Sequence, residues 1–142
     1  MSTMIRYYHE VKAYRLAFGL QQEVYRLSRG WPAEESRSLT SRALVAARAI
    51  GAGLSQAWAR RSDPAEFVTK LTEVDAELAE TLHWLETAHC CGYLADKDYQ
   101  ELRANCAALS RMLGMMARAE QRLPGSEPSS GISVRELSQR LS

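Results

Sequence analysis

The chain of 142 residues is poor in the residues that form disulfides or carry catalysis. It holds three cysteines (Cys90, Cys91 and Cys106), three histidines, four prolines and eight glycines. An odd number of cysteines, two of them adjacent, does not make a disulfide framework and suits a reducing compartment. We therefore expect free thiols and a cytoplasmic protein.

Long apolar runs are missing as well. No run approaches the ~20 residues that a membrane-spanning helix needs. The first residues, MSTMIRYYHEVK, carry charges and have no long apolar core, so they do not resemble a secretory signal. We expect no membrane partner.

No catalytic, phosphate-binding or metal-binding motif stands out. Gly51-Ala52-Gly53 lies inside a helical pattern without a preceding strand, unlike a phosphate loop. His89, Cys90 and Cys91 are consecutive, so a helix would point them in different directions. The Glu80-x-x-His83 spacing occurs once, whereas a di-iron bundle needs it on two helices with further glutamates. We therefore expect no metal, no cofactor and no enzymatic activity.

Helical periodicity is what the chain has in abundance, and Leu39 to Ser62 shows it best. Apolar residues recur there at intervals of three or four, as on the buried face of a helix: Leu39, Ala43, Ala47, Ile50, Leu54 and Trp58. Gly51 and Gly53 each destabilise a helix interior by about 1 kcal/mol relative to alanine. We therefore expect that close packing or a bend in the helix requires them. The abundant small residues would let neighbouring helices approach closely. We expect this helix to be central.

Three more helices are predicted around it. The first runs from about Tyr8 to Arg29, ends at Gly30 and Pro32, and carries two adjoining apolar stripes that together form one wide core-facing surface. One stripe comprises Val11, Tyr14, Phe18 and Tyr25, and the other comprises Ala13, Ala17, Leu20, Val24 and Leu27.

The third and fourth helices have recognisable ends. Asp63 is placed to cap the third, with Pro64 at the first helical position and Glu66 at the third, and Gly92 ends it. Asp96 is the nearest N-cap for the fourth. Each of the two helices carries a single apolar stripe with residues three or four apart. The stripe of the third helix comprises Phe67, Leu71, Val74, Leu78, Leu82, Leu85 and Ala88. The stripe of the fourth comprises Tyr99, Leu102, Cys106, Leu109, Leu113 and Met116.

These features predict an all-α protein, an antiparallel up-down four-helix bundle over residues 1–123 with a flexible C-terminal tail at 124–142. The tail begins with the linker-like PGSEPSSG. Ser133 and Glu136 then form a capping box ahead of Leu137, so the tail contains either a short helix or a disordered end.

Charge is unevenly distributed although the net charge is only +1. Residues 1–62 hold 10 Lys/Arg against 4 Asp/Glu, a balance of +6, and residues 63–123 hold 6 against 11, a balance of −5. Such asymmetry is typical of a nucleic-acid surface, and arginine suits phosphate. The candidate nucleic-acid-binding residues are Arg37, Arg42, Arg48, Arg60 and Arg61, with Arg26 and Arg29 nearby. The alternative is that these arginines are solvated or pair with acids within or between subunits.

The order of the short motifs resembles the four helix bundle protein family, also called the 23S rRNA-intervening sequence proteins, over roughly residues 8–122. Leu39-Thr40-Ser41 matches the family's L-T-S entry to its second helix. The segment from Val45 to Ser62 aligns with the family signature R-A-A-x-S-I-P-S-N-I-A-E-G-x-x-R-x-S. Four positions depart from that signature: Gly51, Gly53, Gln56 and Ala57.

Other matches lie on both sides of this signature. The first helix matches F-x-x-L-x-V-W-x-x-A and I-Y-x-L, and the third matches E-x-x-E-T-x-x-W-L and G-Y-L. The matching residues are Tyr8, Val11, Ala13, Tyr14, Ala17, Tyr25, Leu27, Trp31, Pro32, Glu77, Glu80, Thr81, Trp84, Leu85, Gly92, Tyr93 and Leu94.

The resemblance implies a bacterial four-helix bundle that assembles into a homo-oligomeric ring, most often a homopentamer. Many members have no assigned activity. The family includes accessory variability proteins of diversity-generating retroelements, which bind RNA or DNA and a reverse transcriptase through a basic surface. The expected function is therefore a non-enzymatic nucleic-acid-binding accessory or scaffold. The alternative is a purely structural or protein–protein interaction module.

Overall fold

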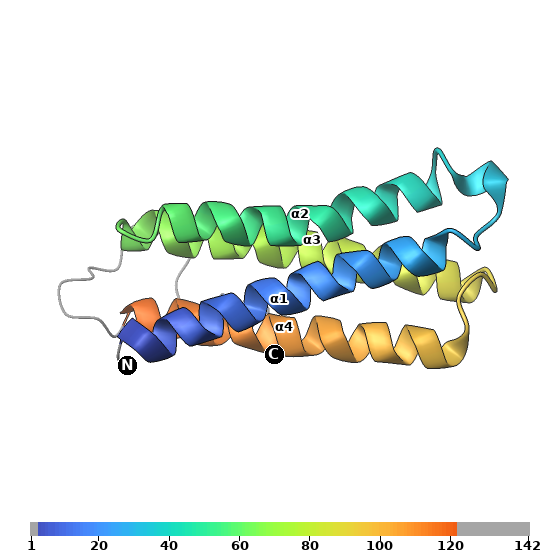
Figure 1. The fold of residues 1–142 in the computed structure, drawn as a ribbon. Helices are drawn as coiled ribbons and strands as arrows, with labels where there is room; N and C mark the ends of the chain where they lie inside the picture. Colours follow the sequence, from blue (N-terminus) through green and yellow to red (C-terminus); the bar gives the residue numbers. More distant parts are fainter. Residues whose placement is uncertain (1–2, 122–142) are drawn as a thin grey trace.

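The computed structural model describes residues 3–121, and the side chains of residues 10–120. Its elements are α1 (Thr3–Ser28), the short 3-10 helix η1 (Ala33–Glu35), α2 (Leu39–Ala59), α3 (Pro64–Cys90) and α4 (Asp96–Gln121) (Figure 1). The described residues contain no strand. The prediction of an all-α fold with four long helices is confirmed. The tail at 124–142 lies outside the described residues.

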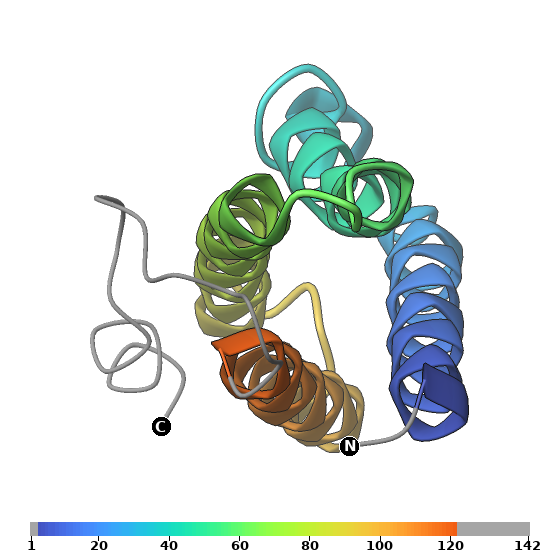
Figure 2. The same cartoon turned by 90° about the vertical axis from the view of Figure 1, so that its left-hand side faces the viewer.

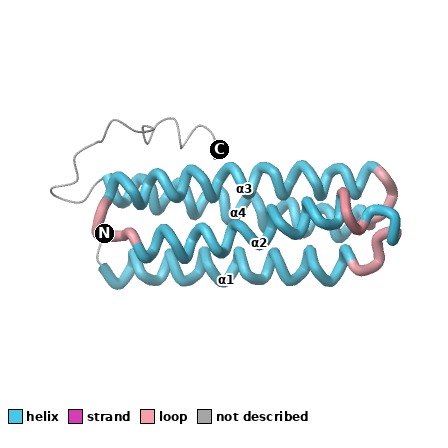
Figure 3. The backbone as a smooth tube through the Cα atoms, turned by 90° about the horizontal axis from the view of Figure 1, so that it is seen from above, coloured by secondary structure: helices cyan, strands magenta, loops and turns pink. Residues whose placement is uncertain are grey.

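The four helices run along a common direction, with loops at both ends (Figure 3). Successive helices point in opposite directions, as an up-down bundle requires (Figure 1). Seen end-on, they surround a shared axis, and each contacts its two neighbours in the order α1, α2, α3, α4 (Figure 2). None of the described helices is long and apolar enough to cross a membrane.

The two ends of α3 follow the sequence signals closely. Asp63 Oδ1 accepts hydrogen bonds from the backbone N–H groups of Ala65, at 3.1 Å, and Glu66, at 3.3 Å. At the other end Gly92 has a φ of +80°, while Gly92 N–H donates to the His89 carbonyl and Tyr93 N–H to that of Ala88. This pattern is a Schellman cap, whose left-handed residue favours glycine.

Three other predicted boundaries were wrong. α1 already begins at Thr3 rather than near Tyr8, although its end at Ser28 is within one residue of the predicted end. Gly30 does not cap it with a left-handed residue, because Gly92 is the one described glycine with a positive φ. Asp96 is the first residue of α4 rather than its N-cap, and the Tyr99 N–H bonds to the carbonyl of Ala95 just before it.

The core contains most of the predicted row of α2. Leu39, Ala43, Ala47, Ile50 and Leu54 are all buried, and Trp58 is half-buried. The stripes of α3 and α4 are buried as well, apart from the half-buried Leu82. The expectation that α2 is the central helix was wrong, because α2 contacts two neighbours, α1 and α3, as each of the other helices does.

The two glycines of α2 face different neighbours. A Cβ atom built on Gly53 would lie 2.6 Å from Val74 Cγ2 of α3, a distance that no pair of carbons tolerates. A Cβ on Gly51 would lie 3.7 Å from Gln21 Oε1 and 3.8 Å from Tyr14 Cε1 of α1, which is ordinary contact. Only Gly53 is therefore required for close helix packing.

One of the two stripes on α1 is not in the core. Ala13, Ala17, Leu20 and Val24 are buried, as predicted. Tyr14, Phe18 and Tyr25 remain 41%, 46% and 40% exposed, so the expectation that both stripes face the core was wrong. The small residues of α1 occupy its contact with the bundle, which leaves the larger aromatic side chains at the flank beside α2.

Candidate functional site: arginines and aromatic rings around α2

The five predicted arginines are all exposed but do not form one patch. Arg42 and Arg48 lie on α2, Arg37 precedes the helix, and Arg60 and Arg61 follow its end. Because a helix rises about 1.5 Å per residue, Arg42 and Arg60 are roughly 27 Å apart along the axis. The arginines are distributed along the length of α2 rather than collected at one point.

No carboxylate neutralises these arginines within the described part of the chain. α2 contains no acidic residue at all. None of the five, nor Arg29, forms an ion pair among the described residues, whereas Arg26 pairs with Glu23 one turn away. Pairing with another described residue is therefore not what holds them, and among these residues their charge is left for a ligand or another subunit.

Aromatic rings hold three of them instead. The Arg61 guanidinium lies 4.2 Å from the Trp58 ring centroid, and its Nη1 donates to the Trp58 carbonyl at 2.9 Å. Arg42 lies 5.8 Å from the Trp84 ring of α3. Significant cation–π contacts extend to about 6 Å, so Arg42 is held loosely and Arg61 more firmly.

The third arginine, Arg48, shares an aromatic ring with a second arginine, which is seen nowhere else among the described side chains. Arg48 of α2 lies 5.6 Å from the Tyr25 ring centroid, and Arg29, just after α1, lies 5.7 Å from it. Sequence reasoning placed Tyr25 in the core and so missed this cluster. The signal that could have revealed it is the absence of any acid on α2.

Tyr25 belongs to a larger exposed surface, which we call the α1/α2 aromatic face. It consists of Tyr14, Phe18, Tyr25 and Arg29 from the α1 side, and Arg48 from α2. Tyr14 and Phe18 stack with ring centroids 6.3 Å apart and planes inclined by 27°. The face combines exposed rings with cations that no described carboxylate balances.

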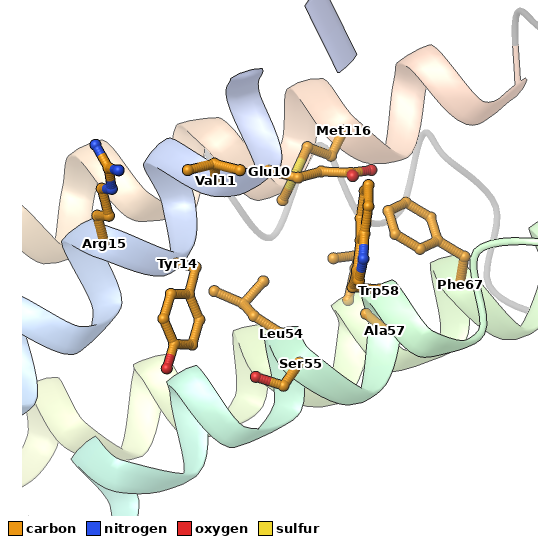
Figure 4. A pocket seen from close by; sticks show the side chains of 11 residues that line it. Glu10, Val11, Tyr14, Arg15, Leu54, Ser55, Ala57, Trp58, Phe67 and Met116 are labelled. Carbon is orange, nitrogen blue, oxygen red and sulfur yellow. The ribbon is translucent and has the colours of Figure 1, made fainter. Parts of the chain in front are cut away.

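An apolar pocket of about 370 Å³ opens where this face reaches the end of α2 (Figure 4). Leu54, Phe67, Leu71 and Met116 form its apolar walls, and Glu10, Arg15 and Ser55 are the polar residues that line it. Tyr14 lines both the pocket and the aromatic face. The two features therefore form one continuous, largely apolar surface beside Arg15.

The two motifs considered for metals do not converge. Among the described residues, no three His, Cys, Asp or Glu side chains are grouped so that they could hold an ion. His89 Nε2 lies 3.2 Å from Asp96 Oδ1, and its ring stacks on Tyr99, so it faces α4 rather than the cysteines. Glu80 and His83 are exposed, outside the core where a di-iron site would lie.

The three cysteines differ sharply in environment, which gives a testable expectation. Cys90 and Cys91 are exposed, while burial raises the pKa of the Cys106 thiol to about 12. Because the thiolate is the reactive form, two thiols per native chain should react with a chromogenic disulfide reagent, and the third only after unfolding. Cys106→Ala should lower the denatured count from three to two and leave the native count at two. Three fast thiols in the native protein would contradict the buried position of Cys106.

The four departures from the family signature lie mostly in packed positions. Gly51 and Ala57 are buried, and Gly53 is half-buried against Val74. Gln56 is exposed. Three of the changes therefore concern how α2 fits its neighbours, and only that at Gln56 alters the surface.

Comparison with known proteins gives one family match. The family model described as 23S rRNA-intervening sequence protein matches residues 9–115, a span from within α1 into α4. No curated protein matches the chain.

Proposed function

Because the chain belongs to the 23S rRNA-intervening sequence protein family, we propose that it is a non-enzymatic, self-associating bundle that binds RNA or DNA. The surface proposed for this role is the set of arginines along α2: Arg37, Arg42, Arg48, Arg60 and Arg61. In a cytoplasmic setting the protein would act as an accessory or scaffold. A reverse transcriptase is the proposed protein partner if the gene lies in a retroelement.

The observation that supports nucleic-acid binding is the unneutralised charge of these arginines. Each guanidinium is exposed, and none is paired with a carboxylate among the described residues. Arginine binds phosphate through two parallel hydrogen bonds, and a polyanion would supply the negative charge that the described residues do not place beside these arginines. Copies in a ring would repeat the same basic helix several times.

Arg60→Gln with Arg61→Gln should weaken binding to a mixed-sequence RNA and reduce its salt dependence. Each phosphate contact contributes about 0.7–0.9 to the slope of log K against log salt, so we expect the slope to fall by about 1.5. The matched control is Arg103→Gln with Arg111→Gln, two exposed arginines on α4 that should leave the slope unchanged. Affinity should be measured by fluorescence anisotropy over a range of salt concentrations. No binding at low salt, or an equal effect of both pairs, would remove the proposal.

Self-association predicts a particle several times heavier than one chain. Size-exclusion chromatography with light scattering should give about five times 15.9 kDa if the ring is a pentamer. A clean 15.9 kDa species at micromolar concentration would contradict this part of the proposal.

The alternative function is a protein–protein module without nucleic acid. It is favoured by Glu66, Glu80 and Glu86 of α3, which are exposed and form no ion pair among the described residues. Arginines of one copy could then meet these glutamates of the next. In that case Arg60→Gln with Arg61→Gln would change the particle mass instead of RNA affinity.

A further inference from the structure

The α1/α2 aromatic face has a composition that the arginines alone do not explain. Among the described residues, three of the five large hydrophobic side chains that remain exposed lie on it: Tyr14, Phe18 and Tyr25. A solvent-exposed helix flank normally carries polar side chains. A cluster of exposed rings on one flank of α1 is therefore typical of a binding surface.

The rings form a row along the helix. Tyr14 and Phe18 are four residues apart, and Phe18 and Tyr25 seven, so all three project from the same side of α1. At about 1.5 Å per residue the row extends roughly 16 Å. One strand of nucleic acid advances about 3.4 Å per nucleotide when stacked, so the row matches the length of a few nucleotides.

Positive charge predominates beside this row. Glu10 lines the pocket at the Tyr14 end, but the stretch of α1 from Lys12 to Gln22 contains no acid, and neither does α2. Glu23, the next acid along α1, is engaged by Arg26. Arg29 and Arg48 lie over the Tyr25 ring at distances near the limit of cation–π attraction, where that attraction is weak. Turning from the ring to a phosphate would therefore cost either arginine little and would free the ring face for a base.

We propose that the α1/α2 aromatic face binds single-stranded nucleic acid, with bases stacked on Tyr14, Phe18 and Tyr25 and phosphates on Arg29 and Arg48. Exposed rings beside a basic surface are a recurrent way in which proteins hold single strands without reading sequence. A duplex cannot use the rings, because its bases are already stacked on one another. This inference rests on the proposed function and specifies which form of nucleic acid is bound.

The test compares a labelled 20-nucleotide oligo(dT) with a 20-base-pair duplex at one salt concentration. Base–aromatic stacking is worth about 1–3 kcal/mol per base on alanine substitution, which corresponds to about 5- to 150-fold in affinity. Phe18→Ala and Tyr25→Ala should each weaken oligo(dT) binding by such a factor and leave duplex binding nearly unchanged. Tyr25→Phe, which keeps the ring, should bind oligo(dT) as the unaltered protein does.

A matched control lies on another helix. Met115 of α4 is also an exposed large hydrophobic residue but is not part of this face, so Met115→Ala should leave oligo(dT) affinity unchanged. Arg48→Gln should lower the salt slope for oligo(dT) by about 0.7, the value for one contact to a single strand.

Three outcomes would overturn this inference. If oligo(dT) and duplex bind equally well and the ring variants have no effect, the stacking face is refuted while nucleic-acid binding stands. If Phe18→Ala or Tyr25→Ala changes the particle mass in light scattering and leaves oligo(dT) affinity intact, the face is a protein interface. If neither nucleic acid binds at low salt, the proposed function is refuted as well.

Discussion

Ile50→Ala is expected to lower the free energy of unfolding by about 2–5 kcal/mol, the range measured for large-to-small changes in protein cores. Ile50 is 0% exposed and lies in the middle of the buried row of α2, between Ala47 and Leu54. Removing three carbons there leaves a cavity that four packed helices cannot fully close. Because domains are stable by only about 5–15 kcal/mol in total, the loss would be a large part of the stability.

The measurement is urea unfolding followed by circular dichroism at 222 nm. Val45→Ala is the matched control, because Val45 lies on the same helix but is 65% exposed, and surface changes usually stay within about 0.5 kcal/mol. Both variants should be measured at several protein concentrations, since self-association adds to apparent stability by mass action. Equal effects of the two substitutions would show that α2 is turned differently from the described structure.

Gly53→Ala and Gly51→Ala are expected to change the free energy of unfolding by different amounts although the two glycines are only two residues apart. In a helix interior, alanine stabilises the helical conformation by about 1 kcal/mol relative to glycine. At Gly51 the new methyl group makes ordinary contacts with Gln21 and Tyr14, so we expect the stability to rise by about that amount. At Gly53 it would meet Val74 Cγ2 at 2.6 Å. Overpacking lowers the free energy of unfolding by about 1–3 kcal/mol. At Gly53 this loss should therefore cancel or exceed the stabilisation that alanine brings to the helix.

The decisive quantity is the difference between the two glycine variants, which should be about 1–3 kcal/mol in favour of Gly51→Ala. The double variant Gly53→Ala with Val74→Ala removes the methyl group that causes the clash. The double variant should therefore have a higher free energy of unfolding than the sum of the two single changes predicts, as expected for residues in direct contact. Additive effects would mean that α2 and α3 do not approach each other at this point.

The sequence predicted more of the fold than of the site. Asp63 with Pro64 and Gly92 marked the ends of α3 correctly, because capping depends on a few consecutive residues. The charge imbalance pointed to α2 and the residues around it. It did not show that Arg42, Arg48 and Arg61 each meet an aromatic ring. Two of those rings, Trp84 and Tyr25, belong to other helices, and no local pattern connects residues so distant along the chain.

By itself, the sequence determined that four long helices form and which faces of α2, α3 and α4 are buried, because three-four apolar spacing and end caps act within a single helix. Only the tertiary structure decided which of the two stripes on α1 enters the core, which glycine of α2 must remain a glycine, and which arginines share Tyr25. These depend on how each helix is rotated against its neighbours. That rotation is set by the combined volumes of side chains from all four helices, since a core must be filled to nearly crystalline density.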